Sequence, residues 1–184
     1  MEGRPPDADL VRRAQHGDDD AIRHIVTTYQ DIAFRIAYLI TRSQEDARDA
    51  TQEGLIKALG ALSRFDRSKP LRPWLLRIVA NEARNRTRAA RRSGMLELRV
   101  ASEPSGDAAP SPEAALLASD ARAELLRAVN QLPEDQRLVV ALRYFAGLSE
   151  EETAAALGVR PGTAKSRHSR AIGRLRELMG AADA

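Results

Sequence analysis

The sequence predicts an all-α protein made of two small helical domains and a flexible linker, with a helix-turn-helix at the end of the second domain. Apolar residues recur at helical spacing through residues 7–92 and again after residue 112. Between these blocks, residues 93–112 gather Pro, Gly, Ser and Ala and lack a regular apolar pattern. We therefore expect one domain at residues 1–92, a linker at residues 93–112 and a second domain at residues 113–184.

The first domain is expected to contain four helices. Asp9 and Asp18 are candidate N-caps of the first two, because a carboxylate there accepts hydrogen bonds from free backbone N–H groups. The third should begin near Ser43 and end at the segment SRFDRSKPLRP, whose two prolines argue against regular helix; Trp74 should open the fourth. The apolar positions available for the core are Ile22, Ile25, Val26, Tyr29, Ile32, Ala33, Ile36, Ile40, Ala47, Ala50, Leu55, Ala58, Leu59, Leu62, Leu75, Ile78, Val79 and Ala83.

The second domain is expected to contain two helices ahead of its helix-turn-helix. Pro133 marks the start of the second of them, since proline fits the first turn of a helix better than its interior. Gly147 then leads into the last part of the chain. The apolar positions of the two helices are Leu116, Leu117, Leu125, Leu126, Val129 and Leu132, followed by Leu138, Val139, Leu142 and Phe145.

Residues 148–179 carry the local signals of a helix-turn-helix. Ser149 and Glu152 have the spacing of a capping box at the start of the first helix. Gly158 suits a left-handed helix exit, and Pro161 suits the first turn of the next helix. The first helix has a small apolar face of Ala154, Ala155 and Leu157. The second helix can enter a DNA major groove, and its basic residues are Arg160, Lys165, Arg167, Arg170, Arg174 and Arg176.

A second basic face is predicted on the fourth helix of the first domain. Arg77, Arg84 and Arg88 are separated by seven and four residues, which places them on one side of a helix. Phe65 and Trp74 lie nearby, and aromatic rings beside cations suit the unstacked bases of single-stranded DNA. The alternative is a solvated helix end whose cations face the helix dipole, with Trp74 in the core.

A third cluster is acidic and consists of Glu45, Asp46, Asp49 and Glu53, with Gln52 beside them. Carboxylates at such spacing bind metals in some helical bundles, but those sites usually add a histidine at a set offset, and no histidine is near. We therefore expect neither a metal nor another cofactor. The cluster is either a solvated face or a protein-docking surface.

Composition narrows the function classes. The 184 residues carry a formal net charge of +3, yet the sequence pI is about 9.7, so the distribution of charge matters more than its sum. The chain has no cysteine, which excludes disulfides and thiolate metal sites. The N-terminal MEGRPPDADL lacks the apolar core of a secretion signal, and no apolar run is long enough to cross a bilayer. We expect a cytoplasmic protein without membrane insertion.

Three segments together resemble the extracytoplasmic-function (ECF) sigma factors of bacterial RNA polymerase. The family's polymerase-docking helix is similar to EDARDATQEGLIKAL. Its segment that melts and reads the promoter −10 element is similar to FDRSKPLRPWLLRIVANEARNRTR, and its −35 reader to LSEEETAAALGVRPGTAKSRHSRA. The three occur in the family's order, and the resemblance covers nearly the whole chain.

The resemblance implies roles for individual residues. The polymerase β′ clamp helices would contact Asp49, Gln52 and Glu53. The opened −10 strand would contact Phe65, Trp74, Arg77, Ile78, Asn81, Arg84 and Arg88, with the loop from Phe65 to Trp74 capturing a flipped base. The −35 element would contact Arg160, Thr163, Lys165, Ser166, Arg167 and Arg170. The implied partners are core polymerase, through its β′ clamp helices and β flap, promoter DNA and an anti-sigma factor.

Four positions depart from the family's usual pattern. Thr153, Ala164 and His168 stand where aliphatic residues are common, so we expect looser packing beneath the recognition helix. Asn85 replaces an acid that often follows the Trp-Leu motif, which leaves the details of −10 recognition open.

Two other function classes remain from the residues alone. One is a free-standing helix-turn-helix regulator with an N-terminal helical sensor domain, which should dimerise on a palindrome. The other is a nuclease using Asp46, Asp49 and Glu53, but it lacks a paired base and a metal-binding histidine. The sigma-factor hypothesis accounts for the docking helix and the Trp74 segment as well, and it implies that the chain is not an enzyme.

Overall fold

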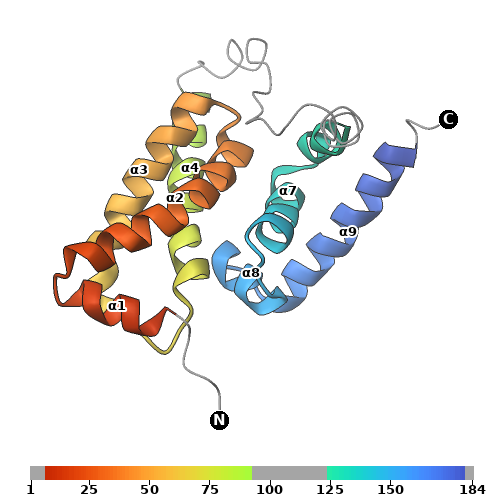
Figure 1. Cartoon of the computed structure of the whole chain (residues 1–184). Helices are drawn as coiled ribbons and strands as arrows, with labels where there is room; N and C mark the ends of the chain where they lie inside the picture. Colours follow the sequence, from red (N-terminus) through yellow and green to blue (C-terminus); the bar gives the residue numbers. More distant parts are fainter. Residues whose placement is uncertain (1–6, 93–123, 181–184) are drawn as a thin grey trace, which may run out of the picture.

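The computed structural model describes residues 7–92 and 124–180, and its regular elements there are helical, which confirms the all-α class (Figure 1). The first domain comprises α1 (Ala8–Gln15), α2 (Asp19–Thr41), α3 (Gln44–Ala61), the 3₁₀ turn η1 (Leu62–Arg64) and α4 (Leu71–Arg92). The second comprises a helical segment at 124–131, α7 (Glu134–Val140), the π-helical turn η2 (Ala141–Phe145), α8 (Glu150–Leu157) and α9 (Pro161–Gly180). The predicted linker at 93–112 and the first residues of the second domain lie outside the described residues.

Side-chain caps set the starts of α2 and α3 as predicted. The Asp18 carboxylate accepts a hydrogen bond from Ala21 N at 3.0 Å. Ser43 Oγ accepts one from Asp46 N at 3.1 Å. Each bond satisfies one of the backbone N–H groups that a first helical turn leaves free.

The predicted cap of the first helix is wrong by two residues. Helix α1 begins at Ala8 after Asp7, so Asp9 lies inside its first turn, where a negative charge favours the helix dipole. Asp7 makes no side-chain cap and instead accepts a hydrogen bond from Tyr29 Oη at 2.9 Å. A tertiary contact to α2 has therefore replaced the local one.

The predicted start of the fourth helix is also wrong. Helix α4 begins at Leu71, three residues before Trp74, and includes Pro73 in its first turn. Proline is tolerated there because the N–H groups of a first turn have no intrahelical acceptor. The two prolines therefore frame the helix start, with Pro70 just outside it, rather than excluding helix between them.

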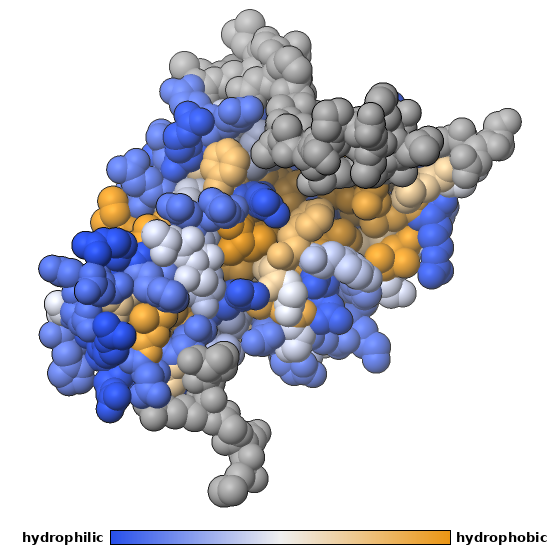
Figure 2. Space-filling model, in the orientation of Figure 1, coloured by the Kyte–Doolittle hydropathy of each residue, from blue (hydrophilic) through white to orange (hydrophobic). Residues whose placement is uncertain are grey.

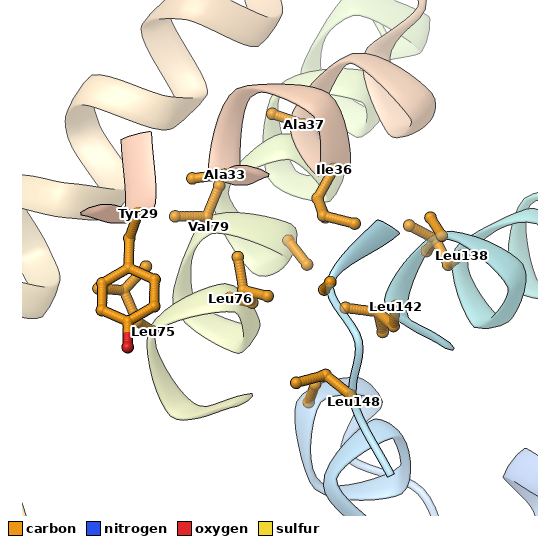
Figure 3. Packing of buried hydrophobic residues seen from close by; sticks show 14 of the residues in the cluster. Tyr29, Ala33, Ile36, Ala37, Leu75, Leu76, Val79, Leu138, Leu142 and Leu148 are labelled. Carbon is orange, nitrogen blue, oxygen red and sulfur yellow. The ribbon is translucent and has the colours of Figure 1, made fainter. Parts of the chain in front are cut away.

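The apolar core extends through both domains. Its largest fully buried side chains include Tyr29, Ile36, Leu76, Leu138 and Leu142, and Figure 3 shows that the last four lie around the junction of α2, α4 and α7. In the orientation of Figure 1, apolar residues gather in the band between the domains, whereas the outer face of the first domain is mostly hydrophilic with a few apolar spots (Figure 2). The second domain thus completes its core against the first.

Three predicted core positions are exposed instead. Phe145 is 42% exposed because the π-helical turn adds a residue to the repeat and rotates this side chain away from the face of Leu138 and Leu142. Leu125 is 40% exposed. In α8, Ala155 faces solvent while Thr153 turns inward beside Ala154.

Helices α3 and α4 approach each other closely at Gly54. A Cβ atom placed there would lie 2.8 Å from Val79 Cγ2 and 2.9 Å from Val79 Cα. Such distances leave no room for a side chain, so glycine at this position lets the two helices touch. Among the described residues, no helix combines the length and apolarity needed to cross a membrane.

Candidate nucleic-acid and polymerase interface

The helix-turn-helix forms with the predicted local contacts. Glu152 N donates to Ser149 Oγ at 3.1 Å, and Ser149 N donates to Glu152 Oε2 at 2.7 Å, which completes the capping box of α8. Gly158 adopts a left-handed conformation with φ +68° and ends α8, and Pro161 is the first residue of α9. The turn therefore fixes the direction of the basic helix α9.

Helix α9 (Pro161–Gly180) and Arg160 just before it present most of the predicted −35 contacts to solvent. Arg160, Lys165, Ser166 and Arg170 are exposed, whereas Thr163 and Arg167 are half-buried. Two local bonds hold this face: Ser166 Oγ donates to the Thr163 carbonyl at 3.0 Å, and Arg170 Nε donates to the Ser166 carbonyl at 3.2 Å. The opposite face of α9 is anchored in the domain by Ala164, Ala171 and Leu175.

The packing beneath α9 shows how the unusual residues fit. Ala164 and Thr153 are each 1% exposed, and the Thr153 hydroxyl has no hydrogen-bond partner. His168 lies beside Tyr144, with 3.2 Å between its Nε2 and the tyrosine hydroxyl oxygen and 5.8 Å between ring centroids. A buried hydroxyl without a partner is destabilising, so Thr153 is a weak point under the recognition helix.

The second basic face lies on α4 and is turned toward the second domain. Arg77, Asn81 and Arg88 are exposed, and Arg84 is half-buried because its Nε pairs with Glu134 Oε1 at 3.4 Å. A cavity of about 540 Å³ separates this face of α4 from α7, the α8–α9 turn and α9. The residues that line it are Asn81, Arg84, Asn85, Arg88, Glu134, Asp135, Leu157, Val159 and Arg167.

The aromatic pair near α4 is packed rather than open. The rings of Phe65 and Trp74 lie 4.6 Å apart between centroids, tilted by 48°. Phe65 is 8% exposed, and Trp74 is half-buried, as is Ile78 on the next turn of α4. The loop that carries Phe65 is tied to α1, since the Gln15 amide nitrogen donates to the Phe65 carbonyl at 3.0 Å. In this conformation the Phe65 ring belongs to the core.

The acidic face lies on the exposed side of α3, where Asp49, Gln52 and Glu53 are exposed. Arg86 of α4 reaches it, with its Nη1 3.1 Å from Asp49 Oδ2 and its Nη2 3.5 Å from Glu53 Oε2. Ile56 follows on the same side of α3 and is 61% exposed. The face therefore combines carboxylates, an amide and an apolar residue, and Arg86 partly neutralises its charge.

Sequence reasoning missed the roles of Arg86 and Arg137. Arg86 belongs by sequence to the basic run of α4, but it faces α3 because it lies outside the seven-and-four spacing of Arg77, Arg84 and Arg88. Arg137 is only 3% exposed, and burial, with a smaller contribution from the nearby Arg42 charge, lowers the pKa of its guanidinium to about 10. The signal for Arg137 was its helical spacing from the buried residues 140 and 141.

The fold and these surfaces define a two-domain helical protein with a helix-turn-helix, a second basic helix and an acidic face on α3. Two family models match this chain, one in each domain. The Sigma-70 region 2 model matches residues 25–93, and the Sigma-70 region 4 model matches residues 122–175.

Two relatives and one solved structure agree with these matches. The RNA polymerase sigma-H factor of Pseudomonas aeruginosa is 35% identical over 173 residues, which are 90% of this chain and 89% of the relative. The ECF RNA polymerase sigma-E factor of Escherichia coli K12 is 36% identical over 171 residues, 88% of each chain. The sigma factor RpoE, solved with the anti-sigma factor NepR from Bartonella quintana, aligns with TM-score 0.65 and 26% identity over 86% of this chain and 96% of that one. The chain belongs to the ECF sigma factors of bacterial RNA polymerase.

Proposed function

We propose that this chain is a dissociable initiation subunit that binds core RNA polymerase and directs transcription from promoters with two recognised elements. The observation that carries the proposal is that both sigma regions occur on one chain, in order, on two helical domains that each carry a basic helix. A free-standing regulator would need neither the region 2 domain nor the acidic face of α3.

Docking is assigned to the exposed side of α3. Asp49, Gln52 and Glu53 are exposed there and offer acceptors to cationic groups of the polymerase β′ clamp helices. The second domain would rest on the β flap. Arg86, which pairs with Asp49 and Glu53 in the free chain, would share or release these carboxylates when the polymerase binds.

Recognition of the −35 element is assigned to α9 in the major groove of duplex DNA. The exposed Lys165 and Arg170 of α9, and Arg160 just before it, can reach base edges or phosphates, and Arg and Lys pair well with guanine. Thr163 and Ser166 would add phosphate contacts, and Arg167 would do so once its pair with Asp135 is broken. We therefore expect a −35 element that contains guanine.

Recognition of the −10 element is assigned to α4 and the loop before it. Arg77, Arg84 and Arg88 would bind phosphates of the opened strand, while Asn81 and Ile78 would line the pocket of a flipped base. The stacking surface would come from Phe65 and Trp74 after the loop rearranges, since their rings now pack on each other. Binding the opened strand more tightly than the duplex would drive melting, so the chain makes and breaks no covalent bond and needs no cofactor.

Regulation is assigned to a partner protein. The RpoE chain that resembles this one was solved with an anti-sigma factor, so an anti-sigma factor is the expected inhibitor here as well. It would act by covering the docking or DNA-binding surfaces of this chain in the cytoplasm, where transcription takes place.

The direct test is run-off transcription with bacterial core polymerase on a pool of genomic promoters, with and without the chain. Specific transcripts that require the chain would support the proposal, and their alignment would reveal both elements. If no transcript depends on the chain while the chain alone binds a palindromic duplex, it is a free-standing regulator and the proposal is wrong.

A further inference from the structure

Charged side chains form a ladder of ion pairs between α3 and α4, which lie side by side in the first domain (Figure 1). Arg86 Nη1 of α4 lies 3.1 Å from Asp49 Oδ2, and Arg86 Nη2 lies 3.5 Å from Glu53 Oε2. Lys57 Nζ of α3 lies 3.5 Å from Glu53 Oε1 and 2.6 Å from Glu82 Oε2 of α4. The carboxylates assigned to docking, Asp49 and Glu53, are therefore already paired with cations of this chain.

Arg86 bridges two like charges that lie one helical turn apart. Asp49 and Glu53 are separated by four residues, so their carboxylates are neighbours on α3 and repel each other. The two Nη atoms of Arg86 reach one carboxylate each, whereas its Nε is buried and has no hydrogen-bond partner among the described residues. The two carboxylates are therefore the polar groups that hold this guanidinium at α3.

Lys57 contacts the other oxygen of Glu53 and is itself held by Glu82. The Glu82 side chain is only 13% exposed, and its contact with Lys57 Nζ anchors the ammonium beside α3. The hydrogen bond to Glu82 is the main cause that raises the pKa of Lys57, so the ammonium stays charged at neutral pH. Both oxygens of Glu53 thus face a cation before any partner binds.

These intramolecular pairs oppose the binding of a cationic partner. The side chains of Asp49 and Glu53 are still 49% and 47% exposed, so a partner can reach them. Its cations would, however, come close to Arg86 and Lys57, which repel them. Each carboxylate has also gained the interaction energy of its present pair, which the partner must replace. The ladder therefore lowers the affinity of the acidic face for cations without closing that face.

We propose that Arg86 and Lys57 are intramolecular competitors that set the affinity of this chain for core polymerase. Arg86 has the larger effect, because it contacts both docking carboxylates and Lys57 contacts only Glu53. By weakening docking relative to unpaired carboxylates, the ladder makes the subunit easier to release from the polymerase. The inference rests on the proposed function, since it concerns the affinity of the proposed docking face.

The test compares single variants of the whole 184-residue chain in titrations of labelled bacterial core polymerase. R86M and K57M each remove one cation of the ladder together with its hydrogen-bond donors. The matched control is R91M, which removes one exposed positive charge from the same helix. Arg91 lies five residues after Arg86, outside the spacing of three or four that would place the two side chains on one face.

We expect R86M to bind core polymerase roughly 2- to 10-fold more tightly than R91M, because it releases two half-exposed ion pairs. K57M should also bind more tightly than R91M, but by a smaller factor than R86M. The gain of R86M should shrink as the salt concentration rises, since ions screen exposed charges. It should also shrink when R86M is combined with D49N, because only the carboxylate of Glu53 is then left to be released.

Equal affinity of R86M and R91M, or weaker binding by R86M, would overturn the proposal. So would a gain that is the same with and without D49N, because it would then come from net charge rather than from released carboxylates. Urea unfolding shows whether each variant is folded. If R86M folds poorly, K57M decides: tighter binding than R91M supports the proposal, and equal or weaker binding overturns it.

The unmodified chain separates this inference from the proposed function. If it binds core polymerase and supports run-off transcription while R86M and R91M bind alike, only the competition within the ladder is wrong. If the unmodified chain does not bind core polymerase, the proposed function is wrong and this inference is wrong with it.

Discussion

Helices α4 and α9 both carry a row of arginines, but their surroundings differ. Two arginines of helix α4 form ion pairs with other elements: Arg86 pairs with Asp49 of α3, and Arg84 pairs with Glu134 of the second domain. Helix α9 leaves Lys165 and Arg170 exposed. Among the described residues, the proposed −35 reader therefore has no ion pair to the proposed docking face, whereas the proposed −10 reader is paired both with that face and with the second domain.

This difference suggests that α4 and α9 have separate roles in initiation. A helix whose contacts reach the docking face can respond when polymerase binds, because polymerase competes for the same carboxylates. A helix without contacts to the docking face can read duplex DNA in the same way before and after docking. The predictions that follow separate docking, −35 reading and packing, in order of decreasing effect.

The largest effect should come from removing the docking carboxylates. D49A/E53A should weaken core polymerase binding roughly 100-fold or more, since truncating one partner of a buried interfacial charge pair costs about 2–5 kcal/mol. Titration of labelled core polymerase measures the change in affinity. The matched control is D20A/D31A, which removes two exposed carboxylates from α2. Wild-type affinity for D49A/E53A would show that α3 is not the docking surface.

Removing exposed cations from α9 should affect promoter reading and leave docking unchanged. K165A/R170A should weaken binding to the −35 element by about 1–3 kcal/mol for each base-specific hydrogen-bonding side chain that is removed. Run-off transcription and duplex binding at fixed salt measure the effect. R174A/R176A removes two exposed arginines farther along α9 and should cost less, with no change in sequence preference. If both pairs weaken all sequences equally, α9 does not read bases.

The close approach of α3 to α4 can be tested at a single glycine. G54A places a Cβ 2.8 Å from Val79 Cγ2 and should lower the free energy of unfolding by about 1–3 kcal/mol, because the two helices must move apart. G60A lies on the same helix with no atom within 4 Å and should raise it by about 0.5–1 kcal/mol. Urea unfolding measures both. Equal effects of the same sign would contradict the close approach.

The smallest effect concerns the packing under α9. T153V removes a buried hydroxyl that has no partner and should raise the free energy of unfolding by about 1 kcal/mol. T153S keeps the hydroxyl, removes the methyl group and should be less stable than the unmodified chain. Duplex affinity should stay the same in both, since Thr153 lies away from the DNA face. A destabilised T153V would mean that the hydroxyl is hydrogen-bonded in solution.

The sequence predicts the helix-turn-helix better than the start of α4, because the signals of the helix-turn-helix are local. The capping box of Ser149 and Glu152, the left-handed Gly158 and the one-sided charge of α9 all act within a few residues. The start of α4 is harder to predict, since Pro73 is compatible with either a break or a first turn.

Interactions between distant segments could not be predicted from the pattern. Arg137 bonds the Leu39 carbonyl, 98 residues away in sequence, and Arg84 pairs with Glu134, 50 residues away. Each is a charged residue of ordinary appearance whose partner depends on how the domains pack. Periodicity identifies the face of a helix but not the helix that covers it. The roles of individual residues toward polymerase and DNA accordingly remain proposals.

One measurement tests the central claim, that the chain acts as an initiation subunit by docking on core polymerase through α3. Run-off transcription with bacterial core polymerase on a pool of genomic promoters is compared for the unmodified chain, D49A/E53A and the control D20A/D31A. We predict specific transcripts with the unmodified chain and with the control, and none with D49A/E53A at the same concentrations. Specific transcripts at unmodified levels from D49A/E53A would contradict the claim, because docking would then not depend on the carboxylates of α3.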